Sequence, residues 1–90
     1  MNDIYRYREW SSTDELPKGF TEWLKEIVKK REASESYWKI ARELSVNPSL
    51  LSRWIAGFGP LCQDDIRELS SVLGPVVYTF LGLPRPDYDE

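Results

Sequence analysis

Two strong helix-boundary signals lie close together in the middle of this chain and limit what it can fold into. Asn47 followed by Pro48 is a typical helix start, because asparagine caps the first free N–H groups and proline is favoured at the first helical position. Gly57 is typical of a helix end, because glycine readily adopts the left-handed conformation that closes the last turn. The sequence therefore predicts a short helix over Pro48–Ala56.

A second short helix is predicted immediately before this one. Ser34-Glu35-Ser36 interrupts the preceding helical pattern and offers an N-cap for a helix from Tyr37 to Leu44. Only Ser45-Val46-Asn47 separates the two helices. Two short helices joined by three residues have the dimensions of a helix-turn-helix.

The side chains of this segment suit such a motif. A small residue is needed where the helices touch, and an apolar residue is needed in the turn; Ala41 and Val46 supply them. The inner faces are expected to be apolar, with Ile40, Ala41 and Leu44 on the first helix and Leu51 with Leu50, Trp54 or Ile55 on the second. The outer face of the second helix is short and polar, which suits entry into a DNA major groove about 12 Å wide. That face consists of Asn47, Ser49, Ser52 and Arg53.

The remaining periodicity predicts an all-α fold, a compact bundle of about five short helices. An apolar stripe follows Pro17 (Phe20, Trp23, Leu24, Ile27, Val28), and another lies between Cys62 and Gly74 (Ile66, Leu69, Val72, Leu73). Pro75–Leu81 is expected to be a short last helix, although its β-branched residues leave a strand open. Residues 1–16 show no helical period and are expected to form an arm or irregular segment, with a short strand around residues 4–8 as an alternative. We expect the domain to span residues 17–82 and an acidic tail to span residues 83–90.

Composition argues against several classes of function. The chain has no histidine and a single cysteine, Cys62, which removes the commonest general base, the usual zinc ligand sets and any internal disulfide. We therefore expect no enzyme activity, no metal, no cofactor and no small-molecule ligand. No apolar run approaches the roughly 20 residues that cross a bilayer, and no secretion signal is evident, so a cytoplasmic protein without a membrane partner is expected. The net charge of −3 argues mildly against nucleic acid.

The central segment resembles a known family. The stretch SYWKIARELSVNPSLLSRWIAG, from Ser36 to Gly57, is similar to the helix-turn-helix of lambda-repressor-like (Cro/XRE-type) regulators. Similarity continues through Pro60 and an Asp-Ile-x-x-Leu-x-x-x-Leu-Gly pattern that ends at Gly74, and it covers about residues 18–82. The resemblance implies a sequence-specific transcription regulator that places residues 48–56 in the major groove of double-stranded DNA as a homodimer.

The resemblance also implies roles for individual residues. Tyr37, capped by Ser36, takes the place where the family meets a phosphate with an amide and a side chain. Base edges are read from positions that match Asn47, Pro48, Ser49 and Arg53, with Ser52 on the same face and Arg53 the best candidate for a guanine contact. Accordingly, Arg53→Ala is expected to lower specificity more than Lys39→Ala. Lys39 and Arg42 are expected near phosphates, and the loop at Phe58 and Gly59 typically offers backbone N–H groups to them.

Three departures from the family pattern leave alternatives open. Ser45 stands where glycine is frequent, Ile55 where glutamate is frequent, and Pro48 where a hydrogen-bond donor is frequent. Arg53 also has a structural alternative, a solvated side chain paired with a glutamate, and Lys29-Lys30-Arg31 suits either phosphate or solvent. An exposed aromatic at Trp38 would favour a second function, a protein-protein interaction module on the same fold.

Overall fold

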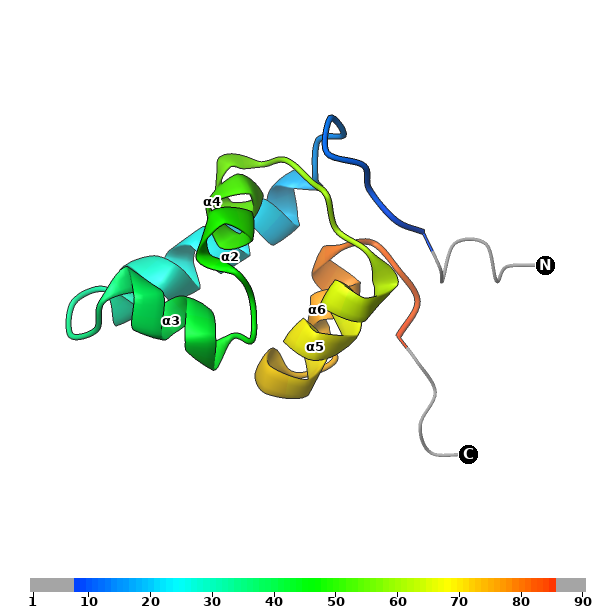
Figure 1. The fold of residues 1–90 in the computed structure, drawn as a ribbon. Helices are drawn as coiled ribbons and strands as arrows, with labels where there is room; N and C mark the ends of the chain where they lie inside the picture. Colours follow the sequence, from blue (N-terminus) through cyan, green and yellow to red (C-terminus); the bar gives the residue numbers. More distant parts are fainter. Residues whose placement is uncertain (1–7, 86–90) are drawn as a thin grey trace.

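The computed structural model describes residues 8–85, and over that range the chain is all-α, with helices and connecting segments but no strand (Figure 1). The helices follow one another with short connections and pack into one compact body. Their bounds are α2 Lys18–Arg31, α3 Tyr37–Glu43, α4 Pro48–Ala56, α5 Gln63–Leu73 and α6 Val76–Phe80.

The predicted capping signals of α3 and α4 are confirmed. The side chain of Ser36 accepts a hydrogen bond from the Lys39 amide at 3.3 Å, and that of Asn47 accepts one from the Ser49 amide at 2.8 Å. Gly57 ends α4 with a φ of 99°, in the left-handed region that favours glycine. Ser45, in the turn, also has a positive φ of 59°, so the chain adopts the glycine-like conformation without a glycine there.

The outer helices also agree with the sequence, and the alternative of a final strand is wrong because residues 76–80 form α6. Trp23 of α2 stacks on Phe80 of α6, with ring centroids 4.6 Å apart and an interplanar angle of 11°. Val72 departs from the predicted apolar stripe, because it is 41% exposed at the end of α5. No helix within the described range is long and apolar enough to cross a bilayer.

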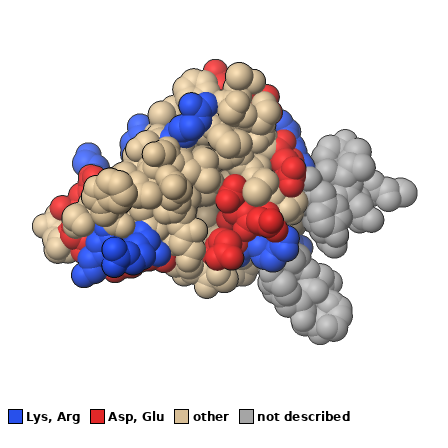
Figure 2. Space-filling view, in the orientation of Figure 1, with Lys and Arg blue, Asp and Glu red and all other residues tan. Residues whose placement is uncertain are grey.

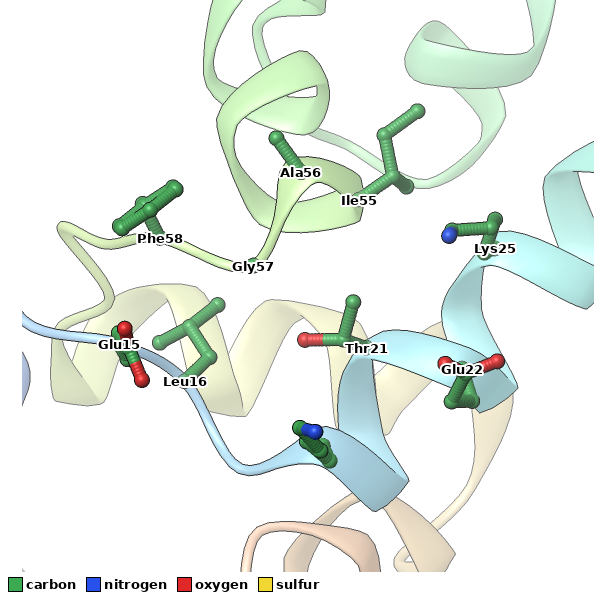
Figure 3. Close-up of a pocket in the computed structure, with 10 residues that line it drawn as sticks. Glu15, Leu16, Thr21, Glu22, Lys25, Ile55, Ala56, Gly57 and Phe58 are labelled. Atoms are coloured by element: carbon green, nitrogen blue, oxygen red, sulfur yellow. The ribbon is translucent and has the colours of Figure 1, made fainter.

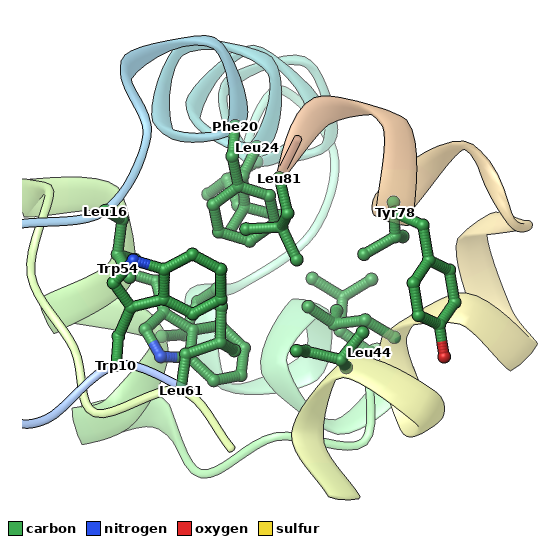
Figure 4. Packing of buried hydrophobic residues seen from close by; sticks show 14 of the residues in the cluster. Trp10, Leu16, Phe20, Leu24, Leu44, Trp54, Leu61, Tyr78 and Leu81 are labelled. Carbon is green, nitrogen blue, oxygen red and sulfur yellow. The ribbon is translucent and has the colours of Figure 1, made fainter. Parts of the chain in front are cut away.

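One continuous hydrophobic core joins all five helices. Trp54 is the largest side chain that is almost fully buried, and its indole N–H donates to the Pro60 carbonyl at 2.8 Å, so its polar atom is satisfied inside the protein. Figure 4 shows Trp54, Trp10 and Leu61 at the same end of this core. The other buried hydrophobic residues are Leu16, Phe20, Leu24, Val28, Ile40, Ala41, Leu44, Leu51, Ile66, Leu69, Val77, Tyr78, Leu81 and Leu83.

The segment before α2 belongs to this core. Residues 8–16, called the arm below, run antiparallel to residues 57–61 (Figure 1), and Trp10 and Leu61 exchange backbone hydrogen bonds of 3.0 and 2.9 Å. The Leu16 amide donates to the Gly57 carbonyl at 2.9 Å. Trp10 and Leu16 are each only 4% exposed. The core therefore extends beyond residues 17–82 at this end, and buried Leu83 extends it at the other. The strand considered around residues 4–8 falls almost wholly outside the described residues.

A local turn shapes the arm. The Ser11 amide donates to the Asp14 carboxylate at 2.7 Å, and the Asp14 amide donates back to the Ser11 carbonyl at 3.1 Å. The hydrogen bond from the Ser11 amide favours the ionised carboxylate and lowers the pKa of Asp14 below its ordinary value. This turn brings the Ser11 carbonyl against the backbone of Gly59.

Gly59 is required by that close approach. A Cβ atom at this position would lie 2.3 Å from the Ser11 carbonyl oxygen and 3.2 Å from that of Trp10. Both neighbours are backbone atoms, which cannot rotate away as a side chain can.

We predict that Gly59→Ala lowers the free energy of unfolding by about 1–3 kcal/mol, because the new methyl group must separate the arm from residues 57–61. Urea unfolding followed by circular dichroism measures this. Gly19→Ala in the first turn of α2 is the matched control, because its Cβ would meet nothing nearer than Phe80 at 4.0 Å, and it should be neutral or slightly stabilising. Equal stability of the two variants would contradict the close approach.

Candidate nucleic-acid interface

The outward face of α4 is polar, as the sequence predicts. Ser49, Ser52 and Arg53 are exposed, whereas Leu51 and Trp54 are buried on the opposite side. Trp54, rather than half-buried Leu50, therefore accompanies Leu51 inside. Because serine side chains are short, Ser49 and Ser52 add little bulk to this face, and Arg53 is its one long side chain.

The start of α4 is held by its own cap. The Asn47 side-chain oxygen is occupied by the Ser49 amide, which leaves the two N–H donors of the Asn47 amide group. Ser49 is exposed, and its hydroxyl makes no hydrogen bond within the described residues. Asn47 and Ser49 thus offer polar atoms at the N-terminal end of α4, whereas half-buried Pro48 contributes its carbonyl to a contact with α3.

That contact is made by Tyr37, the first residue of α3. Its hydroxyl donates to the Pro48 carbonyl at 3.1 Å and lies 2.8 Å from the Ser52 hydroxyl. The sequence did not indicate this link between α3 and α4. It commits the only hydroxyl proton of Tyr37 to Pro48, so the phosphate contact predicted for Tyr37 is restricted to its backbone amide.

The guanidinium of Arg53 is engaged by the arm. Its Nε–H donates to the Gly59 carbonyl and its Nη2–H donates to the Ser12 carbonyl. The predicted alternative, a pair with a glutamate, is therefore wrong, because backbone carbonyls are the partners. Two of the five donors of Arg53 hold the arm and the loop after α4 together, which restrains a base contact. That base contact stays a prediction.

The expectation for the loop at Phe58 and Gly59 is corrected. The Phe58 amide donates to the Arg53 carbonyl at 2.9 Å, and the Gly59 amide donates to the Asp14 carbonyl at 3.1 Å. Both N–H groups are thus satisfied inside the protein and are not offered to phosphates. The side chain of Phe58 remains 40% exposed.

Helix α3, which packs against α4, carries exposed positive charge. Figure 2 shows basic side chains gathered where α3 lies, bordered by acidic ones, and a separate acidic group over α5. The exposed cations of α3 are Lys39 and Arg42, and neither makes an ion pair within residues 8–85. Arg31 of the predicted basic run is paired with Glu43 at 3.1 Å, whereas Lys29 and Lys30 are exposed.

Trp38 is the most exposed large hydrophobic residue of the described chain, at 69%. The exposed aromatic considered at Trp38 is thus present. It stands on α3 next to Lys39. An indole in this position is available to a partner of the α3 surface.

A shallow groove of about 270 Å³ lies between the arm, α2 and the end of α4 (Figure 3). Two lysines and two glutamates stand among its lining residues, so its charge favours neither an anionic nor a cationic ligand. The hydroxyl of Thr21 is buried against the groove and has no hydrogen-bond partner among residues 8–85. The lining residues are Glu15, Leu16, Lys18, Thr21, Glu22, Lys25, Ile55, Ala56, Gly57 and Phe58.

Cys62 has a structural position at the start of α5. Burial raises the pKa of its thiol, and the thiol donates to the Asp65 carboxylate at 3.2 Å. A raised pKa keeps the sulfur protonated at neutral pH, which makes it a weak nucleophile. Among residues 8–85, no group of histidine, cysteine and acidic side chains is placed to hold a metal ion.

Comparisons with protein-family models, with curated protein sequences and with solved structures found no match to this chain. The candidate interface is therefore defined by its own geometry: a short polar face on α4, a hydroxyl link to α3, and two cations on α3 that make no ion pair within the described part of the chain.

We predict that Arg53→Ala lowers the free energy of unfolding by about 1–2 kcal/mol, since charge-assisted hydrogen bonds to two carbonyls are lost from a partly solvated site. Arg42→Ala removes the same charge from an exposed position without an ion pair and should change stability by less than about 0.5 kcal/mol. Chemical denaturation of both variants measures the difference. An Arg53 variant as stable as the Arg42 variant would show that the hydrogen bonds from Arg53 to the Ser12 and Gly59 carbonyls contribute nothing to stability.

Proposed function

We propose that α3, the turn and α4 form a lambda-repressor-like helix-turn-helix, and that the protein is a sequence-specific DNA-binding transcription regulator. The observation that carries this proposal is the short polar face of α4, on a helix that packs against α3 with its exposed cations Lys39 and Arg42. A major groove admits an α-helix, and small polar side chains let the helix backbone come close to the base edges.

The proposal gives each exposed group a role that its free atoms allow. Asn47 has two amide N–H donors left for a base acceptor or a phosphate, and Ser49 has a hydroxyl that can donate or accept. Lys39 and Arg42 are assigned to phosphates, together with the Tyr37 amide at the start of α3. Because Arg53 is held by the arm, its base contact ranks behind those of the serines and Asn47 in this scheme.

Affinity is expected to come from two copies. One recognition face has few unpaired cations, and the chain has a net charge of −3, so a single copy gains little from phosphate neutralisation. A homodimer would double these contacts and read two half-sites about 34 Å apart.

The experiment that tests the proposal is selection from random duplexes at low salt, followed by Kd measurements on the selected site across a salt series. The affinity should fall steeply with salt, and Lys39→Ala and Arg42→Ala should each lower the slope of log K against log salt by about 1. Arg67→Ala on the acidic α5 is the matched control, because it also removes one positive charge but should leave the slope unchanged.

A protein-protein interaction module is the second candidate, and the exposure of Trp38 is the observation that favours it. An indole that is 69% exposed is an apolar surface of the kind that partner proteins cover. A folded protein that enriches no duplex in the selection, and whose weak DNA binding responds equally to all three charge variants, would favour this function over the first.

A further inference from the structure

The hydroxyls of Ser52 and Tyr37 and the carbonyl of Pro48 form a chain of hydrogen bonds, and the carbonyl sets its direction. Tyr37 Oη lies 3.1 Å from the Pro48 carbonyl and 2.8 Å from Ser52 Oγ. A carbonyl oxygen can only accept, so the hydroxyl proton of Tyr37 points at Pro48. Tyr37 has no second proton, so both hydrogen bonds form together only when Ser52 donates to Tyr37.

This direction changes what Ser52 offers to solvent. A free serine hydroxyl can donate or accept a hydrogen bond. The Ser52 hydroxyl donates its proton to Tyr37, so toward solvent its oxygen can only accept. Ser52 remains exposed on the outer face of α4, in line with Ser49 three residues earlier. The two serines of this face therefore differ in chemistry: Ser49 is unrestricted, whereas Ser52 is an acceptor.

We propose that Tyr37 is a positioning residue for base specificity, and that it makes Ser52 select a base with an exocyclic amino group. In the major groove, adenine N6 and cytosine N4 are donors, whereas thymine O4 and guanine O6 are acceptors. On the strand that Ser52 faces, the amino group of adenine or cytosine donates a hydrogen bond to Ser52 Oγ. Guanine O6 or thymine O4 instead places its lone pairs against those of Ser52 Oγ, which is unfavourable. This inference rests on the proposed DNA-binding function and specifies one position of its site.

The test compares variants on the duplex selected by the wild-type protein. Ser52→Ala first identifies the position, as the one at which the base preference of the wild-type protein changes. There, the wild-type Kd is expected to rise about fivefold or more when adenine or cytosine is replaced by guanine or thymine. Tyr37→Phe should bring this ratio close to one, because the released Ser52 proton can then be donated to O4 or O6. Preferences at other positions should persist.

Two further variants separate a lost hydroxyl from a damaged fold. Trp38→Phe changes the neighbouring aromatic residue, which is not a member of the Tyr37–Ser52 hydroxyl pair, and it should keep the wild-type ratio. Ser52→Thr retains the hydroxyl, and it should keep the preference for adenine or cytosine while Tyr37 is present. Circular dichroism verifies that each variant is folded. If Tyr37→Phe does not fold, the comparison of wild type, Ser52→Ala and Ser52→Thr decides whether the Ser52 hydroxyl selects adenine or cytosine.

A result that refutes the role of Tyr37 and Ser52 differs from one that refutes the proposed DNA-binding function. A wild-type protein that selects a site but shows no preference for amino bases where Ser52→Ala acts overturns the inference and leaves the proposed function standing. The same holds if folded Tyr37→Phe keeps the wild-type ratio, or if Ser52→Thr favours guanine or thymine. If the wild-type protein selects no duplex, the proposed function fails first and the inference fails with it.

Discussion

The backbone pairing between the arm and residues 57–61 is the constraint on which the rest of this structure depends. It ties a segment without helical periodicity to the loop that follows α4, through reciprocal hydrogen bonds between Trp10 and Leu61 and a contact that only Gly59 can make. The pairing also buries Trp10 and Leu16 and closes the core around Trp54. A chain of this size has a modest core, so two additional buried side chains are a substantial part of it.

The same pairing determines which hydrogen-bonding groups of α4 and the following loop stay available to a partner. Arg53 turns toward the carbonyls of Ser12 and Gly59, and the amides of Phe58 and Gly59 are used internally. Charge on the candidate interface therefore comes chiefly from α3, and hydrogen-bonding atoms come from the uncharged side chains at the beginning of α4. In the proposed function this division assigns affinity to α3 and base selection to Asn47, Ser49 and Ser52.

Local signals in the sequence predicted the helices well, because helix ends depend on a few neighbouring residues. Asn47, Pro48 and Gly57 act within one turn of the backbone, and the structure places all three as the sequence indicates. The arm could not be predicted in this way, since Trp10 and Leu61 are far apart in the sequence. Glycines close together at 57 and 59 were the available sign of a close backbone approach. The partners of Arg53 and Tyr37 depend on tertiary contacts that no periodicity encodes.

The most direct test of this account is native-state hydrogen exchange at the amides of Gly59 and Leu61, which donate to carbonyls of the arm. If the arm is part of the folded core, both amides exchange only on global unfolding, with protection equal to that of core amides in α2 such as that of Leu24. Exchange of Gly59 and Leu61 at the rate of unprotected amides, with α2 still protected, would show that the arm is not docked and that Arg53 is free for another role.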